Sequence, residues 1–236
     1  MQLEPIRTND RSAGSVVLGR PISAEAQKVL RNTYMLLALT MVPTIGGAVV
    51  GMATGGIILQ HPIISSLVML AAVIGLQFAI VANRNSPIGI ALLLLMTGIL
   101  GWWIGPMLNF ALALKNGAQL VGYAAAGTGI VLFAMATVAT TTKRDFSFLG
   151  KFLFVGMIAL IIAMFANMFL QIPALGLALS TIAIVIFSLF LLHDLSRIVT
   201  GGETNYIVAT TGVYISLLNI FVNLLNLLMA FTGEKD

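Results

Sequence analysis

The sequence predicts an all-α integral membrane protein that folds as a bundle of seven transmembrane helices. Two properties of the composition point to a membrane: hydrophobic residues make up 59% of the 236 residues, and charged residues make up only 8%. A soluble domain carries about 25% charged residues, which keep its surface in water. The third observation is a series of apolar runs of about twenty residues, the length that crosses ~30 Å of hydrocarbon.

The first segment, residues 1–31, differs from the rest of the chain. It holds five of the twelve Lys and Arg residues and three of the eight acidic residues. We interpret it as an N-terminal tail. A short helix is predicted near residues 23–30, because Ser23 is a good N-cap and the following AEAQ sequence favours helix.

Seven apolar runs follow, and each is predicted to cross the membrane: residues 34–54, 62–81, 88–108, 120–140, 149–170, 173–192 and 208–231. The breaks between them carry Gly, Pro, Asn or charged residues, which are typical of turns. Every predicted loop is short. We therefore predict a single membrane domain at residues 32–231 and a short C-terminal tail at residues 232–236.

Lysine and arginine are distributed unevenly between the two predicted sides of the membrane. The side shared by the N-terminal tail and the second, fourth and sixth loops carries ten of them, whereas the opposite side carries Lys115 and Lys235. Loops that are rich in Lys and Arg stay on the cytoplasmic side. The sequence therefore predicts an inner-membrane protein with a cytoplasmic N-terminal tail and a C-terminal tail outside.

Small residues recur at spacings of three and four on the first and third predicted helices. Such a pattern lets two membrane helices approach closely. We therefore predict helix-packing surfaces, and no functional site, at two sets of glycines: Gly47, Gly51 and Gly55, and Gly98, Gly101 and Gly105.

The seventh predicted helix carries a polar stripe. The spacing of 3, 4 and 3 places Ser216, Asn219, Asn223 and Asn226 on one helical face. An amide that faces lipid is costly, so the stripe must face protein or a water-filled cavity. Two interpretations stay open. Either the stripe makes hydrogen bonds that hold the bundle together, or this helix lies at the centre of the bundle and lines a polar pathway.

Asp194 lies at the end of the sixth apolar run, where an ionisable group is a candidate for function. The sixth helix ends on the side where the seventh begins, so Ser216 is expected at a comparable depth. The sequence thus predicts a candidate ion- or pH-sensing site at Asp194, Ser216, Asn219 and Arg197. The alternative is a structural ion pair between Asp194 and Arg197, which are spaced i, i+3.

Several classes of function are disfavoured. The chain has no cysteine, which excludes disulfides and thiol chemistry. Neither His61 nor His193 has two further ligands nearby in the sequence, so no firm metal site is predicted. No paired acids stand at membrane depth, as an intramembrane protease would need. The sequence therefore predicts no enzyme and no cofactor, and the excess of basic residues indicates topology rather than a nucleic-acid partner.

Six motifs resemble those of the transmembrane Bax inhibitor motif family, and most closely its bacterial YccA-type branch. The resemblance covers nearly the whole chain from Lys28 to Phe231. The motifs are KVLRNTY (28–34), KRDFSFL (143–149), ANMFLQIP (166–173), HDLSRI (193–198), GGETNYI (201–207) and NIFVN (219–223).

The resemblance implies a bundle in which the seventh helix is surrounded by the other six. Members of the calcium-leak type carry two aspartates that share a proton and gate a pore. Asp194 matches the first of these, but Ser216 stands at the second position. The carboxylate pair is therefore broken, and the two-carboxylate sensor does not carry over to this chain.

The YccA-type branch implies a different partner, the membrane-bound AAA protease FtsH, which such proteins modulate and which degrades them. The resemblance therefore favours an FtsH modulator whose N-terminal tail meets the protease. Two alternatives remain: a pH-sensitive leak for Ca²⁺ or other cations that uses Asp194, and a structural bundle without transport. Membrane lipids surround the protein in all three cases.

Overall fold

The computed structural model describes residues 22–142 and 144–232, and all regular elements in these two ranges are α-helices. The predicted fold class is therefore confirmed. Seven helices are long and apolar enough to cross a membrane. They are α1 (Ala24–Thr54), α3 (Pro62–Ala82), α4 (Pro87–Leu112), α5 (Gly117–Thr142), α6 (Leu149–Leu170), α7 (Pro173–Val199) and α8 (Tyr206–Thr232). Most of the predicted N-terminal tail, Lys143 and residues 233–236 lie outside the described residues.

Two helices, α1 and α7, extend furthest beyond the predicted apolar runs. The first begins at Ala24 because Ser23 caps it: the Ser23 hydroxyl accepts the Ala26 N–H at 3.1 Å. The helix predicted near Ser23 thus continues into the first membrane helix without a break. The second, α7, runs on to Val199, so Asp194 lies inside a helix rather than after its end.

A short helix, α2 (Gly56–Gln60), joins α1 to α3 and was not predicted. Its five residues, GIILQ, are too few for hydrophobic periodicity to be read. The seventh membrane helix of the sequence prediction is therefore α8 in the structure.

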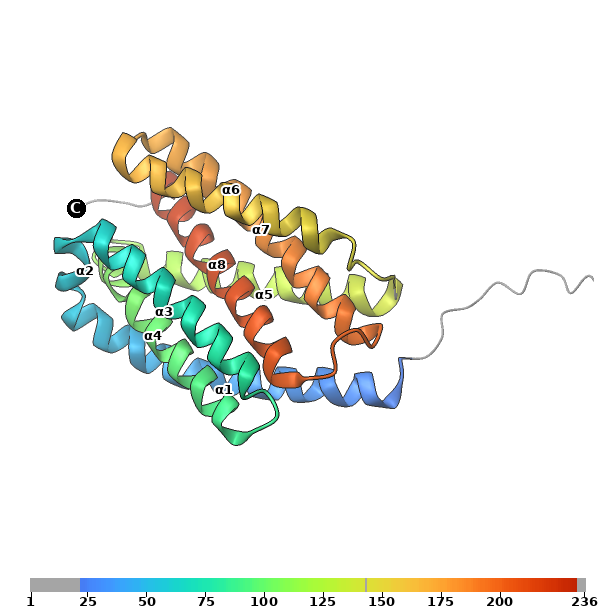
Figure 1. The fold of residues 1–236 in the computed structure, drawn as a ribbon. Coiled ribbons are helices and arrows are strands. Elements are labelled where there is room, and N and C mark those ends of the chain that lie inside the picture. The colour runs from blue at the N-terminus through green and yellow to red at the C-terminus, as the bar shows by residue number, and fades with distance from the viewer. Residues whose placement is uncertain (1–21, 143, 233–236) are drawn as a thin grey trace, which may run out of the picture.

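The last helix is central, as predicted. Figure 1 shows α8 running through the middle of the bundle, with α1, α3 and α4 on one side, α6 and α7 on the other, and α5 crossing behind it. It packs against α1, α3, α4, α5 and α7. The remaining membrane helix, α6, packs mainly against α7 and so lies on the outside of the bundle.

The two predicted glycine surfaces face each other and join α1 to α4. A Cβ added at Gly47 would meet the backbone of Gly98, and one added at Gly51 would meet the backbone of Trp102. In the opposite direction, a Cβ at Gly101 would meet the backbone of Thr44. The glycines therefore let the two backbones touch, and the packing interpretation is confirmed.

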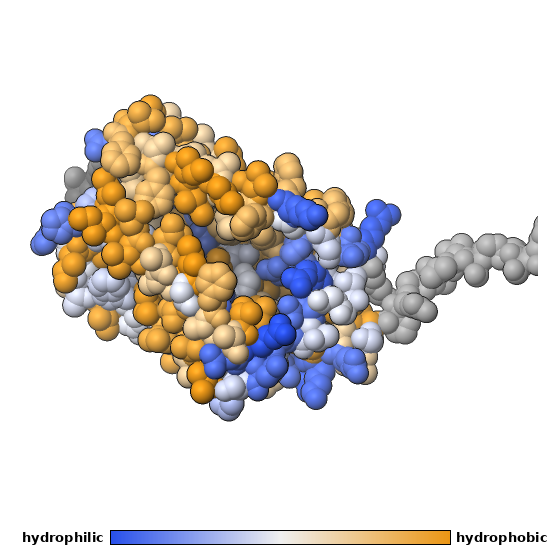
Figure 2. Space-filling model, in the orientation of Figure 1, coloured by the Kyte–Doolittle hydropathy of each residue, from blue (hydrophilic) through white to orange (hydrophobic). Residues whose placement is uncertain are grey.

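Burial follows the position of each helix in the bundle. The core centres on α7 and α8, where Leu191, Tyr214 and Ile220 are no more than 1% exposed. Large apolar side chains on outer helices are exposed instead, and Phe78 and Phe152 are examples. Figure 2 shows this apolar surface over most of the visible face. Such a surface is what a lipid environment requires.

The loops divide between two ends of the bundle. One end, which we call the basic end, holds the start of α1 and the loops that join α3 to α4, α5 to α6 and α7 to α8. Hydrophilic residues gather at this end in Figure 2. The side chains of Arg84, Arg144 and Lys151 are exposed there.

Candidate functional site

A pocket of about 340 Å³ lies near the basic end, where α3 and α7 face each other across α8. Both α3 and α7 pack against α8. Figure 2 shows the surface hollowed on this side, with pale atoms in the hollow and hydrophobic surface along its sides. The pocket is lined by Gln77, Phe78 and Val81 of α3, Asp194 and Arg197 of α7, Glu203 of the following turn, and Val208, Ala209 and Gly212 of α8.

The Asp194 carboxylate is held between a histidine and a glycine. One oxygen, Oδ1, is 3.0 Å from Nδ1 of His193. The other, Oδ2, lies against α8, since a Cβ added at Gly212 would stand 2.5 Å from it. The absence of a side chain at Gly212 therefore lets the carboxylate reach the backbone of the central helix. Asp194 keeps 21% of its side chain exposed, toward the pocket that it lines.

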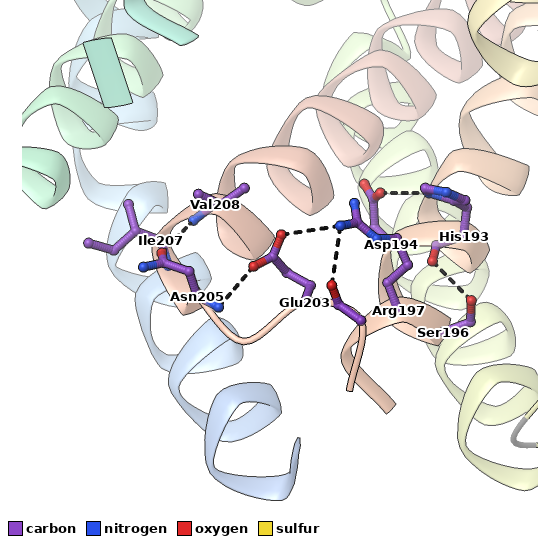
Figure 3. A network of polar contacts seen from close by, with 9 residues as sticks. His193, Asp194, Ser196, Arg197, Glu203, Asn205, Ile207 and Val208 are labelled. Carbon is purple, nitrogen blue, oxygen red and sulfur yellow. Dashed lines mark hydrogen bonds and ion pairs between the residues drawn. The ribbon is translucent and has the colours of Figure 1, made fainter. Parts of the chain in front are cut away.

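The structural ion pair between Asp194 and Arg197, the alternative interpretation of the sequence, is not formed. Arg197 Nη2 instead lies 3.6 Å from Oε2 of Glu203 and 3.4 Å from the carbonyl oxygen of Gly202. The cause is the tight turn after α7. Gly201 has φ 81°, and the N–H of Glu203 bonds back to the Arg197 carbonyl at 3.0 Å. This turn folds Glu203 over Arg197, as Figure 3 shows.

Asn205 organises the start of the central helix, a role that the sequence analysis missed. Its Oδ1 accepts the N–H groups of Ile207 and Val208 at 3.0 and 3.2 Å, so it caps α8. Its amide nitrogen donates to the Arg84 carbonyl at 2.8 Å and so ties α8 to the loop between α3 and α4. An asparagine directly before an apolar helix was the available signal.

The carboxylate of Glu203 links this cap to Arg197. Its Oε1 accepts the N–H of Asn205 at 2.9 Å while Oε2 faces the guanidinium. Figure 3 shows Glu203 between the two partners. Of the GGETNYI motif, Glu203 lines the pocket.

The polar stripe of α8 makes mixed contacts. Asn226 donates to Ser180 of α7 at 2.9 Å, which is the predicted bond between helices. Asn219 and Asn223 donate within α8, to the carbonyls four residues earlier. Ser216 is 2% exposed, and in the described ranges no hydrogen bond joins it to Asp194. Gly212, one turn earlier on α8, lies against the carboxylate instead.

A second polar contact in the core was also missed. The hydroxyl of Tyr214, which is 1% exposed, lies 2.8 Å from Thr44 Oγ1 of α1. It also donates to the Thr97 carbonyl of α4 at 3.3 Å. The central helix is therefore joined to both members of the glycine-packed pair. Tyrosine in an apolar helix has no partner that can be read from spacing, because the partners lie more than one hundred residues away.

The loop between α5 and α6 also closes on α7. The Phe146 N–H bonds to Ser196 Oγ at 3.3 Å. Hydrogen bonds from Ser147 hold the pKa of Asp145 below its ordinary value. Nothing in the described ranges groups three or more His, Asp or Glu side chains as a metal centre would need.

The pocket offers a distinct set of chemical groups. Asp194 provides a carboxylate, Arg197 and Glu203 provide a long ion pair, and Gln77 provides an amide. These groups stand among apolar walls. Apolar walls with a few polar groups are typical of a pocket that binds a small ligand.

Comparison with known proteins places the chain in a family. The model of the family described as inhibitor of apoptosis-promoting Bax1 matches residues 26–233. The chain belongs to the Bax inhibitor family. This match confirms the resemblance carried by the six motifs. It spans nearly all of the described helices.

Two relatives from bacteria match closely within the Bax inhibitor family. The modulator of FtsH protease YccA from Escherichia coli K12 is 43% identical over 201 residues, which cover 85% of this chain and 89% of the relative. A membrane protein of Vibrio cholerae is 41% identical over 204 residues, 86% of this chain and 90% of the relative. A third relative, from E. coli O6:H1, is also 43% identical and is named an inner membrane protein.

Proposed function

We propose that this protein binds an FtsH-type AAA protease in the bacterial inner membrane and modulates its proteolysis of other membrane proteins. The observation that carries the proposal is the 43% identity to the E. coli protein named a modulator of FtsH protease. The match covers 85% of this chain, which is far more than one motif or one helix could supply.

The distribution of charge indicates on which side of the membrane the protease would meet this protein. The exposed cations Arg84, Arg144 and Lys151 gather at the basic end, so we propose that this end faces the cytoplasm. The chain enters α1 at the same end. The N-terminal tail is therefore proposed to lie on the cytoplasmic side, where it serves as the segment that the protease engages, and the C-terminus is proposed to lie outside.

The orientation has a direct test, because the chain contains no cysteine. A single cysteine at Arg84 marks the basic end, and a single cysteine at Lys115 marks the opposite end. A membrane-impermeant maleimide added to intact spheroplasts is expected to label the Lys115→Cys variant and to spare Arg84→Cys. Labelling of Arg84→Cys alone would reverse the proposed topology.

Deletion of residues 2–20 tests the proposed function. The shortened protein is expected to have a longer half-life in cells that contain FtsH, to lose co-purification with the protease, and to change the half-lives of other FtsH substrates. Deletion of residues 233–236 is the matched control and is expected to change none of these. An unchanged half-life together with no co-purification of the full-length protein would remove the proposal.

A cation leak is the second candidate, and the position of Asp194 favours it. The carboxylate lines a pocket beside the central helix rather than being neutralised by Arg197. Flux of Ca²⁺ from proteoliposomes would be compared between the wild type and Asp194→Asn. A lower flux in the variant is expected for a leak that uses Asp194, whereas equal flux from both, or flux from neither, excludes this mechanism.

A further inference from the structure

The pocket lies where a lipid head group would reach it. Its walls come from the last turns of α3, the last two turns of α7 and the first two turns of α8, which all lie at the basic end. Asp194 is five residues before the end of α7, so it stands about 7.5 Å below that end at 1.5 Å per residue. The 27 residues of α7 span about 40 Å, the thickness of a bilayer with its head groups, of which the hydrocarbon core takes up ~30 Å. The depth of Asp194 therefore corresponds to the boundary between head groups and acyl chains.

The pocket is also accessible from the side of the bundle. Figure 2 shows the hollow on the lateral, apolar face of the molecule. Phe78, which lines the pocket from α3, is 74% exposed on that face. Apolar side chains thus flank the way in, and a molecule in the membrane meets the pocket without leaving the lipid layer.

Gln77 is a polar group that the fold itself does not use. It lies in the apolar helix α3 and lines the pocket, and within the described ranges its amide has no hydrogen-bond partner. An amide at membrane depth without a partner is costly. A bound polar group in the pocket would supply that partner.

The charges of the pocket are arranged in two parts. Among the described residues, His193 is the one polar partner of the Asp194 carboxylate, which leaves the carboxylate able to accept from a cationic donor. Three residues further on, both polar contacts that Arg197 makes with described residues use Nη2, so Nε and Nη1 are left to donate to an anion. An acceptor for a cation and a donor for an anion therefore start three residues, about 4.5 Å, apart along α7.

We propose that this pocket binds the head group of a zwitterionic phospholipid that carries a primary ammonium, phosphatidylethanolamine, from the leaflet at the basic end. The ammonium donates to Asp194 and the phosphate accepts from Arg197, while Gln77 bonds to the phosphate or glycerol oxygens. The two-carbon link between ammonium and phosphate suits a separation of about 4.5 Å. The acyl chains leave past Phe78 into the membrane.

Other head groups satisfy fewer of these groups. A choline head group has no N–H to donate to Asp194, and a glycerol head group has no positive charge. A bare divalent cation would bind Asp194 but would leave Nε and Nη1 of Arg197 without an acceptor and would be repelled by the charge of Arg197. Lipid binding at this pocket does not depend on a protease partner.

Native mass spectrometry of the purified, delipidated full chain tests the proposal. Phosphatidylethanolamine, phosphatidylcholine and phosphatidylglycerol with identical acyl chains are titrated separately. One molecule of phosphatidylethanolamine is expected to bind about tenfold more tightly than either other lipid, because charge-assisted hydrogen bonds are lost with them. Equal binding of the three lipids, or a preference for phosphatidylglycerol, overturns the proposal.

Variants tie the preference to the pocket. Asp194→Asn is expected to reduce it by about tenfold, whereas Arg197→Gln is expected to weaken the binding of all three lipids by about tenfold, because each of them carries the phosphate. The matched controls, Glu25→Gln and Lys151→Gln, remove exposed charges elsewhere at the same end and are expected to leave both the preference and the affinity intact. If a charge variant fails to fold, Gln77→Leu replaces one pocket amide by a lipid-compatible side chain and is expected to weaken the binding of all three lipids by several-fold. Unchanged binding in Gln77→Leu and in the folded charge variants contradicts the site.

Two competitors separate the lipid from other ligands of the same pocket. Millimolar phosphoethanolamine, the soluble head group, is expected not to displace the lipid, because it lacks the acyl chains. Millimolar calcium chloride is likewise expected to leave the lipid bound. Displacement by phosphoethanolamine would assign the pocket to a soluble ligand, and displacement by calcium would assign it to a cation; either result overturns the proposal.

Discussion

The contact between α1 and α4 makes a sharp prediction, because two adjacent glycines of α1 have opposite surroundings. A Cβ added at Gly46 meets no atom within 4 Å. A Cβ added at Gly47 would stand 2.9 Å from the Trp102 nitrogen and 3.0 Å from the Gly98 carbonyl carbon, and closer still to the Gly98 oxygen. These are backbone atoms, so no side chain can rotate away. Gly47→Ala therefore requires the two helices to separate.

The size of the effect follows from two opposing terms. Alanine favours a helix over glycine by about 1 kcal/mol, and this gain is the same at both positions. Overpacking of a tight contact costs about 1–3 kcal/mol. Separation by ~0.5–1 Å also forfeits a quarter to a half of each dispersion contact along the pair. We expect Gly46→Ala to be neutral or slightly stabilising and Gly47→Ala to lie about 1–3 kcal/mol below it.

Unfolding in mixed detergent micelles with increasing dodecyl sulfate measures this difference. The chain has two tryptophans, and Trp102 lies in the contact itself, so tryptophan fluorescence reports on the pair directly. The midpoint for Gly47→Ala is expected at a lower fraction of dodecyl sulfate than for Gly46→Ala. Equal midpoints would refute the reasoning, because they would mean that the backbones of α1 and α4 do not touch.

Two further predictions concern hydrogen bonds of the central helix. Tyr214→Phe removes the buried hydroxyl that contacts Thr44 and Thr97, and we expect a loss of about 1 kcal/mol in the same unfolding assay, with a stable variant as the contrary result. Asn205→Ala removes the cap of α8 and its bond to the Arg84 carbonyl, and we expect a loss of about 1–2 kcal/mol. Asn205→Asp keeps the capping oxygen and is expected to recover part of that stability; a variant as weak as alanine would contradict the cap.

Much of the fold was available from the sequence. The lengths of the apolar runs located all seven membrane helices, since the bilayer sets that length independently of tertiary packing. Glycine spacing identified the packing faces of α1 and α4, because close approach of backbones excludes larger side chains. The polar stripe correctly marked α8 as the central helix.

The details of the site were less accessible, because they depend on contacts between distant segments. Charge spacing along α7 suggested that Arg197 pairs with Asp194, but the turn at Gly201 brings Glu203 to it instead. The depth of Ser216 suggested a partner for Asp194, whereas Gly212 lies against the carboxylate. A glycine has no side chain to reveal such a contact in the sequence. For both Arg197 and Asp194, spacing along the helix located the region of the site but predicted the wrong partner.

The pocket follows from the way in which α8 joins the two halves of the bundle. Glycine packing fixes α4 to α1, and α3 packs on α4, whereas α7 packs on α5 and α6. At the pocket, α3 is therefore held in place by α4, and α7 by α5 and α6, and the two helices do not hold each other. Asn205 fixes the start of α8 to the loop after α3, and Glu203 fixes the turn to α7. A space between two helices that are each held by other partners stays open in the folded state. The polar groups that remain there, Gln77 and Asp194, are then available to a ligand from the membrane.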